Sequence, residues 1–319
     1  MPRDLETPTL TALTLVAFAS NSILTRMALA AHEIDASSFT AVRIVSGALM
    51  LAAIVRLKDG SWGALRGRGG VGPLALFGYV APFSFAYLRI GAAVGALVLF
   101  GVVQLTMIGW GLARGERPGL RTWIGLAIAA TGLVALVARP ASRPDPLGVA
   151  LMTLAGVSWG VYSLAGRGTP DPLAANARSF LWCVPAVAAL SLMTQHARFT
   201  SARGLTLAVV SGAITSGLGY AIWYRALRGL SATQAAVVQL SVPVIAALAA
   251  VAFLGETLSV RLAICGIAVL SGVALVLTAG GATPGLRPDA RRRRPRLSRA
   301  TPSAPRRPGT AGPRPGASR

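Results

Sequence analysis

Charged residues are scarce in this chain of 319 residues. Only 13% are Asp, Glu, Lys or Arg, whereas soluble domains carry about a quarter, and the mean hydropathy is +0.62. The scarcest are the ten acidic residues, and none lies near the centre of an apolar run: Asp4, Glu6, Glu33, Asp35, Asp59, Glu116, Asp145, Asp171, Glu256 and Asp289. The composition excludes an ordinary soluble domain, and the placement of the acids argues against a carboxylate relay at mid-membrane.

Cysteine and histidine are also rare, with two of each. Cys183 and Cys265 lie in separate apolar runs without a CxxC partner, and His32 and His196 are isolated. A metal or redox site needs several such ligands at close spacing, so we expect no metal and no cofactor. The chain contains no HExxH motif and no Ser–His–Asp arrangement, so we expect that it is not an enzyme.

Long apolar runs are what the chain has instead. A helix needs about 20 mostly apolar residues to cross a bilayer, and a run such as 92–112 is long enough. Hydropathy separates ten candidate spans: 9–31, 38–57, 71–90, 92–113, 120–138, 147–166, 174–195, 204–224, 231–254 and 259–280. The predicted fold is therefore an all-α membrane protein with ten transmembrane helices. The first run lacks a small-residue cleavage site, which predicts a retained helix and not a signal peptide.

The loop charges predict the orientation. With the N-terminus inside, the inner segments before the tail hold twelve basic residues and the outer loops hold six. The inner ones are Arg3, Arg56, Lys58, Arg66, Arg68, Arg114, Arg117, Arg121, Arg167, Arg178, Arg225 and Arg228; the outer ones are Arg89, Arg139, Arg143, Arg198, Arg203 and Arg261. Because cytoplasmic loops are enriched in Lys and Arg, we expect a multi-pass protein of the cytoplasmic (inner) membrane with both termini cytoplasmic.

The net charge of +21 is concentrated near the C-terminus. Eleven arginines follow position 280 in an Arg- and Pro-rich segment without a hydrophobic period. Such a composition predicts a disordered basic cytoplasmic tail, 281–319, able to contact anionic lipid headgroups. Because much of the basic charge lies there, the charge does not predict a specific nucleic-acid partner.

The two halves of the chain resemble each other. AYLRIGAA at 86–93 aligns with RALRGLSA at 225–232, and the run at 113–136 aligns with that at 253–275, both with an offset near 140. Five spans per half is an odd number, so the second copy enters the membrane in the opposite sense. The sequence thus predicts two inverted-topology five-helix repeats, which are typical of secondary transporters. The predicted organisation is a cytoplasmic N-terminus 1–8, repeats at 9–138 and 147–280, and the tail.

Several motifs resemble those of a known family. They are SNSILTR at 20–26, Arg43, RGERP at 114–118, and SVPVIAALAAVAFLGET at 241–257, in which Pro243 precedes Glu256 by thirteen residues. The chain resembles an EamA-type transporter of the drug/metabolite transporter superfamily over residues 9–280. Its first half departs from the pattern because Val103 stands where a second proline is expected.

Arg43 is the ionisable residue placed deepest in a predicted span. It could extend to the outer interface, form an ion pair with Glu33 or Asp35, or face a cavity and bind a carboxylate-bearing substrate. We favour the ion pair but keep Arg43 among the candidate substrate ligands.

Aromatic and amide side chains are the other candidates for a substrate site. Trp159 and Tyr162 share a helix face at mid-span, and an apolar cavity wall with occasional donors is typical of ligand sites. Trp223 and Tyr224, at the end of their span, are expected in the aromatic belt of the interface. The remaining candidates for substrate binding are Asn21, Tyr79 and Tyr220.

Two similar stretches, VVQLT at 102–106 and VVQLS at 237–241, each place a glutamine in an apolar run. Gln104 and Gln239 are not equivalent in the repeat alignment, since the two stretches are offset by five residues, about 7.5 Å along a helix. We expect Gln104 either to face the cavity or to find a partner in the bundle. Gln239 is also a candidate ligand, and it could alternatively satisfy a backbone group freed by Pro243.

Glu116 and Glu256 each follow a glycine just after the fourth span of a repeat. A carboxylate there can cap the next helix and pair with Arg121 or Arg261, so we assign Glu116, Glu256 and Pro243 structural or gating roles.

The predicted function is secondary transport, through a central site, of a small metabolite. The resemblance suggests an amino acid or related polar compound, and export. The alternatives are a multidrug exporter and a non-transporting membrane scaffold or lipid-binding protein. The expected partners are a small-molecule substrate and the lipid bilayer, with a possible homodimer.

Overall fold

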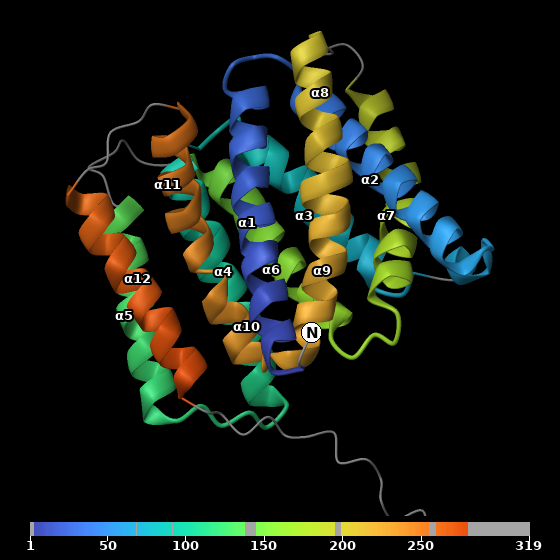
Figure 1. Ribbon diagram of the computed structural model, residues 1–319. Helices are drawn as coiled ribbons and strands as arrows, with labels where there is room; N and C mark the ends of the chain where they lie inside the picture. Colours follow the sequence, from blue (N-terminus) through green and yellow to red (C-terminus); the bar gives the residue numbers. More distant parts are fainter. Residues whose placement is uncertain are drawn as a thin grey trace, which may run out of the picture. The chain divides into compact units, whose positions relative to one another are not determined.

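The computed structural model describes residues 3–67, 69–90, 92–137, 145–194, 199–254 and 260–279. These residues belong to one compact unit, Met1–Thr283, and the predicted tail and Glu256 lie outside the described residues. The elements in chain order are α1 (Arg3–Leu29), α2 (Ala36–Asp59), η1 (Gly63–Leu65), α3 (Gly72–Ala86), α4 (Ala92–Ala113), α5 (Leu120–Val137), α6 (Pro146–Gly166), α7 (Pro172–Met193), α8 (Ala202–Val210), η3 (Ser211–Leu218), α9 (Gly219–Ala226), η4 (Leu227–Gly229), α10 (Ala232–Val238), α11 (Ser241–Leu254) and α12 (Val260–Thr278) (Figure 1).

Helices occupy each of the predicted apolar runs, which confirms an all-α membrane protein. Eight helical segments are long and apolar enough to cross a membrane, and two of these join several elements, 202–229 and 232–249. The helices α3 and α5 are apolar but shorter. The number of ten transmembrane helices therefore stays a prediction.

Three of the scarce aspartates begin helices. The side chains of Asp35, Asp145 and Asp171 each accept a backbone N–H from the first turn of α2, α6 and α7. The Arg89 guanidinium, 2.9 Å from the carboxylate of Asp145, holds the pKa of that aspartate below its ordinary value. A negative charge at a helix N-terminus satisfies free amides and favours the helix dipole, so these acids fix where the spans start.

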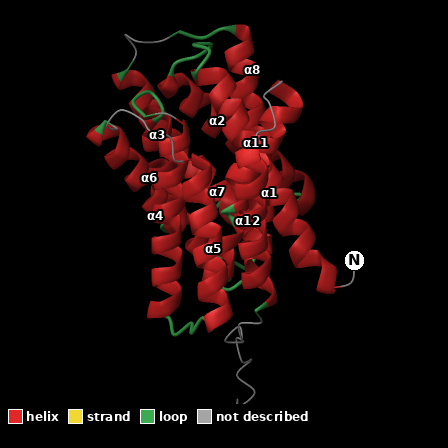
Figure 2. Ribbon diagram, turned by 90° about the vertical axis from the view of Figure 1, so that its left-hand side faces the viewer, coloured by secondary structure: helices red, strands yellow, loops and turns green. Residues whose placement is uncertain are grey.

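The helices form a bundle in which sequence-distant elements are neighbours. The main contacts pair α5 with α12, α3 with α6, α2 with α7, α4 with α6, α2 with η3, and α1 with both α9 and α11. Further contacts pair α3 with α7 and α4 with α10. The α5–α12 pair lies at one side of the bundle (Figure 1, Figure 2). There a Cβ added at Gly125 would lie 2.6 Å from the carbonyl oxygen of Gly272, so glycine permits backbone contact between the two helices.

The outward faces of these helices are apolar. Ile264 and Ile267 on α12 are 64% and 69% exposed, and Ile124 on α5 is 45% exposed. Such apolar exposure is expected of a surface that faces lipid, and it agrees with a multi-pass membrane protein.

Candidate substrate-binding site

Arg43 is the only charged residue that is fully buried in the described part of the chain. It lies two turns into α2, and its side chain reaches elements of the second half. Its Nε donates to the Ser216 hydroxyl at 2.8 Å and its Nη2 donates to the Tyr220 hydroxyl at 2.6 Å. The Tyr79 ring centre lies 5.7 Å from the guanidinium carbon, within range of a cation–π contact. Nη1 has no hydrogen-bond partner in the part of the chain that the structure describes.

The expected ion pair of Arg43 with Glu33 or Asp35 is wrong. Glu33 pairs with Arg203 at 3.5 Å, and Asp35 caps α2 and accepts the backbone N–H of Phe199 at 3.2 Å. Both acids thus find partners in the segment that leads into α8. The full burial of Arg43 also excludes the alternative in which it extends to the interface.

A π-helix, η3, supplies the polar wall beside Arg43. Besides Ser216 it carries Ser211 and Thr215, whose hydroxyls donate to the Asn21 side-chain oxygen at 2.7 and 3.3 Å. The predicted candidate Asn21 is thereby buried at the junction of α1 and η3. Segments of π-helix are rare and are frequent at functional sites because they redirect side chains and backbone groups.

Glycines let α2 lie directly against this π-helix. A Cβ at Gly212 would lie 2.1 Å from the Arg43 carbonyl oxygen, and one at Gly47 would lie 2.8 Å from the Gly212 carbonyl oxygen. A larger residue at either position would force the two backbones apart. The close approach holds Arg43 within reach of its hydroxyl partners.

Trp159 lies at the centre of an aromatic cluster. Its ring centre is 4.8 Å from that of Tyr220, 4.9 Å from Tyr79, 5.1 Å from Phe18 and 5.8 Å from Tyr162. The helices α1, α3, α6 and α9 each contribute to this cluster, and its tyrosines Tyr79 and Tyr220 contact Arg43. The structure therefore brings together four predicted candidates with Arg43.

Tyr162 continues the polar contacts away from Arg43. Its hydroxyl donates to the side-chain oxygen of Asn176, whose amide nitrogen donates to the Gly217 carbonyl at 2.9 Å. The expectation that Trp223 and Tyr224 lie in an interface belt is wrong, since they are 0% and 2% exposed. Their span continues beyond them as far as residue 229, so they lie inside the bundle and not at its end.

The two predicted glutamines meet at a break in one helical span. The span stops at the end of α10 and restarts at α11, with a turn at 239–240. Gln239 Nε2 donates to the Ala235 carbonyl at 2.8 Å, while its Oε1 accepts the Trp159 indole N–H at 2.6 Å. From α4, Gln104 Nε2 donates to the Ala236 carbonyl at 2.7 Å. Both amides therefore satisfy carbonyls at the end of α10, and Gln104 Oε1 is left buried without a partner among the residues that the structure describes.

Pro243 lies in the first turn of α11, where proline costs little because the first amides of a helix have no intrahelical acceptor. The Gln239 carbonyl accepts the Val242 N–H at 3.1 Å instead of a bond from residue 243. The Gln239 side chain was expected to bond a backbone group freed by Pro243. It bonds the Ala235 carbonyl instead, one turn before Gln239 itself.

Glu116 caps a helix, but not the one expected. Its carboxylate accepts the backbone N–H groups of Ala232 at 2.7 Å and Thr233 at 3.1 Å, at the start of α10. Its ion-pair partner is Arg167 at 3.5 Å and not the predicted Arg121. The predicted cap of α5 is wrong because the fold brings the start of α10 against the end of α4.

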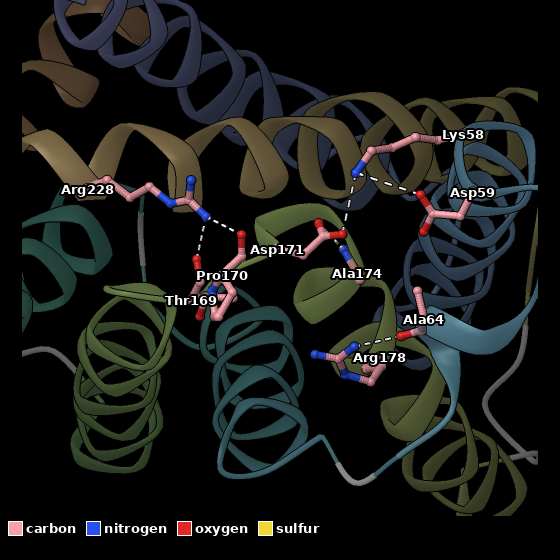
Figure 3. Close-up of polar contacts among 9 residues, drawn as sticks. All are labelled: Lys58, Asp59, Ala64, Thr169, Pro170, Asp171, Ala174, Arg178 and Arg228. Atoms are coloured by element: carbon pink, nitrogen blue, oxygen red, sulfur yellow. Dashed lines mark hydrogen bonds and ion pairs between the residues drawn. The ribbon is translucent and has the colours of Figure 1, made fainter. Parts of the chain in front are cut away.

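Other polar contacts join the halves near the same end of the bundle. Lys58, at the end of α2, lies 3.4 Å from Asp171 at the start of α7, and Arg178 donates to the Ala64 carbonyl at 2.6 Å (Figure 3). Within the second half, Arg228 donates to the carbonyls of Thr169 and Pro170 in the loop before α7 (Figure 3). The basic residues named here were all predicted to be cytoplasmic.

The opposite end has backbone hydrogen bonds between the halves in addition to the Glu33–Arg203 ion pair. Ile34 pairs with Thr200 in an isolated antiparallel bridge, the Asp35 N–H donates to the Phe199 carbonyl at 3.0 Å, and the Ser201 N–H donates to the Glu33 carbonyl at 2.7 Å. Each end of the bundle therefore has its own set of contacts between the halves.

Several site residues were not singled out from the sequence. They are Phe18, Ser163, Asn176, Ser211, Thr215 and Ser216. The stretch SGAITSGLGY at 211–220 carries the signal that could have found three of them, because its small and hydroxylated residues interrupt an apolar run. Within the described residues, no group of three His, Cys, Asp or Glu side chains gathers as metal ligands.

The chain is similar to several known proteins. The family model described as "EamA-like transporter family" matches residues 146–278. Uncharacterized protein PA1977 of Pseudomonas aeruginosa is 50% identical over 86% of this chain and 95% of its own length. The uncharacterized transporter YwfM of Bacillus subtilis is 26% identical, over 77% of this chain and 85% of its own length.

A solved crystal structure shares the fold, with a TM-score of 0.70 at 20% identity, and the match covers 85% of this chain and 99% of that one. The same family is indicated by the apolar helices, by the motifs at 20–26 and 241–257, and by these relatives. The chain belongs to the EamA-like transporter family of multi-pass membrane proteins.

Proposed function

We propose that the protein is a secondary transporter that exports a small metabolite, an amino acid or related polar compound, across the cytoplasmic membrane by alternating access. The observation that carries this proposal is the buried Arg43 site. A guanidinium from the first half is held there by a hydroxyl and a phenol from the second half. An ionisable group inside a membrane bundle marks a substrate or ion pathway by default.

The helix contacts support the proposed repeats at 9–138 and 147–280. In these repeats α1 corresponds to α6, α2 to α7, α3 to the span from α8 to α9, α4 to α10–α11, and α5 to α12. When each helix is replaced by its counterpart, the α3–α6 contact becomes the α9–α1 contact, and the α4–α6 contact becomes the α11–α1 contact. The α2–η3 contact becomes that of α7 with α3. The pairs α2–α7, α4–α10 and α5–α12 exchange into themselves. Such a pattern is expected when two copies are related by a two-fold axis, with the substrate site between them.

The contacts at the two ends are candidates for the two gates. Glu116–Arg167 and Lys58–Asp171 join the halves at one end, and the Ile34–Thr200 bridge joins them at the other. In alternating access each set opens in turn while the other stays closed. Under the predicted orientation, with both termini cytoplasmic, the end with Glu116–Arg167 and Lys58–Asp171 faces the cytoplasm.

Metabolite profiling tests the transport itself. Cells that overproduce the wild-type chain are compared with cells producing Gln104→Ala, by untargeted measurement of metabolites in medium and cytosol. The wild type is expected to shift at least one small polar metabolite toward the medium, and Gln104→Ala to reduce that shift. Thr106→Ala, two residues away, is the matched control because its hydroxyl donates only to its own helix. A medium unchanged by the wild type contradicts the proposal.

A disulfide across one end tests alternating access. Ile34→Cys and Thr200→Cys face each other across the bridge, where paired residues lie about 4.5–5.5 Å apart, a span that a disulfide closes. In a background without the native Cys183 and Cys265, oxidation is expected to stop flux and a reductant to restore it. The single-cysteine variants under the same oxidant are the controls. Undiminished flux through a fully cross-linked protein contradicts the mechanism.

A further inference from the structure

The buried guanidinium of Arg43 has no anionic partner among the described residues. Its hydrogen-bond acceptors, the hydroxyls of Ser216 and Tyr220, are neutral. The described acids with recorded ion pairs have other partners: Glu6 pairs with Arg225, Glu33 with Arg203, Asp59 with Lys58, Glu116 with Arg167, Asp145 with Arg89 and Asp171 with Lys58. A buried positive charge without a counter-charge is costly, so the site as it stands favours the arrival of an anion.

One donor group is available for that anion. The Nη1 group carries two N–H donors and has no hydrogen-bond partner among the described residues, whereas Nε and Nη2 are already engaged. The Ser216 and Tyr220 contacts fix the guanidinium plane and so set the direction in which Nη1 donates. A guanidinium held in this way is suited to a carboxylate, which it recognises by geometry as well as by charge.

The number of buried charges limits the charge that the bound anion can carry. Arg43 is the only fully buried charged residue in the described part of the chain, so one positive charge matches one negative charge. A doubly charged phosphate ester would bring a second, uncompensated charge into the bundle. The surroundings are aromatic: Tyr79 and Tyr220 contact the guanidinium, Trp159 packs against both rings, and aromatic side chains suit an apolar body.

We propose that Arg43 Nη1 binds the carboxylate of the transported molecule, and that this substrate is a small monocarboxylate whose apolar body packs on the aromatic cluster around Trp159. The inference rests on the proposed transport function for its physiological meaning, but the binding site itself is tested separately from flux. A zwitterionic amino acid with an apolar side chain belongs to this class, and an amine or ester that lacks the carboxylate does not.

Four matched compounds test the carboxylate on the unmutated full-length protein in lipid nanodiscs. They are phenylalanine, 3-phenylpropionate, phenylalaninamide and phenethylamine, and the readout is the concentration dependence of the melting temperature. The two acids are expected to raise the melting temperature in a saturable way, whereas the amide and the amine do not. Equal stabilisation by the compounds without a carboxylate, or no effect of any of the four, overturns the inference.

A pair of variants on the same helix tests Arg43. Arg43→Gln is expected to weaken the apparent affinity for both acids by about tenfold or more, since hydrogen bonds to charged groups have that magnitude. Arg56→Gln is the matched control, because Arg56 also lies on α2 but is exposed and contacts the Trp62 ring. Unchanged acid binding by a folded Arg43→Gln overturns the inference. If that variant does not fold, the four-compound comparison still decides.

Flux of the same compounds in proteoliposomes separates the two proposals. Binding of the acids without flux of any compound supports the Arg43 site and contradicts transport of this class. Flux of phenethylamine that exceeds flux of the acids supports transport and contradicts the carboxylate site.

Discussion

The helices α4 and α10–α11 hold the same place in the two predicted repeats, yet only one of them is continuous. α4 runs unbroken from Ala92 to Ala113, whereas its counterpart ends at Val238 and restarts at Ser241. In the repeat alignment Val103 stands opposite Pro243. Proline lacks the N–H that continues a helix, so only the second copy must interrupt its hydrogen bonds.

The break in this helical span is stabilised by side chains from both copies. Carbonyls at the end of α10 accept side-chain amide donors from Gln239, in the broken copy, and from Gln104, in the continuous one. The unbroken helix thus supports the broken one.

Val103→Pro transfers the break to the continuous copy. Val103 is fully buried in the middle of α4, and proline there removes a helix hydrogen bond and clashes with the preceding turn, at a cost of about 3 kcal/mol or more. We expect the melting temperature of the solubilised protein to fall well below that of Val103→Ala, which loses only apolar contacts. Similar melting temperatures for the two variants would show that α4 need not be continuous.

Gln239→Leu removes the donor and the acceptor at the break itself. The Ala235 carbonyl and the Trp159 indole N–H then lose partners within a buried region, at a combined cost of about 2–4 kcal/mol. Thermal unfolding measures the loss. Gln234→Leu is the control, since the half-buried Gln234 side chain bonds the N-cap amide of α10 and not a group at the break. A Gln239→Leu protein as stable as the control would mean that these bonds contribute nothing to stability.

Gln104→Leu is expected to cost less, about 1 kcal/mol or below. The Ala236 carbonyl keeps a second donor, the backbone N–H of Gln239 at 3.1 Å, and the change also removes the unpartnered Oε1. The same unfolding measurement places Gln104→Leu between Thr106→Ala and Gln239→Leu. A larger loss than that of Gln239→Leu reverses the ranking and assigns the main support of the break to α4.

Pro243→Ala is expected to change stability least, by less than about 1 kcal/mol. Alanine restores an N–H that can donate to the Gln239 carbonyl and so favours a continuous helix. Hydrogen exchange of the amides at 239–243 is expected to slow, and flux to fall if the break moves during transport. Unchanged exchange would show that the tertiary contacts, and not the proline, maintain the break.

The helical character of each span could be predicted from the sequence because apolar runs of membrane length have few alternatives, whereas the end of the span at 204–224 and the break in that at 231–254 were not. The candidates Trp159, Tyr162, Tyr79 and Tyr220 were also found, since polar aromatics at mid-span are uncommon. Arg43 was placed correctly as a candidate, but its partners were not predicted. Its acceptors lie more than 170 residues away in the chain, whereas the acids proposed for it were the nearest in sequence.

The local backbone departures could not be predicted for a related reason. The π-helix η3 depends on Gly212 meeting α2, and the turn at 239–240 depends on donors that α4 and α6 supply. Glu116 caps α10 because the fold places that helix within reach, which no spacing along the chain shows. Backbone irregularities that depend on contacts with residues distant in the sequence cannot be predicted from a short local stretch.

The position of the tryptophans has an optical consequence. Of the six indoles, Trp159 and Trp223 are buried in the aromatic cluster, whereas Trp62, Trp110, Trp123 and Trp182 are between 43% and 56% exposed. Quenchers in the lipid and water phases should therefore extinguish the emission of the outer four and leave that of the inner two. The residual fluorescence then reports on the interior of the bundle in real time, without any attached label.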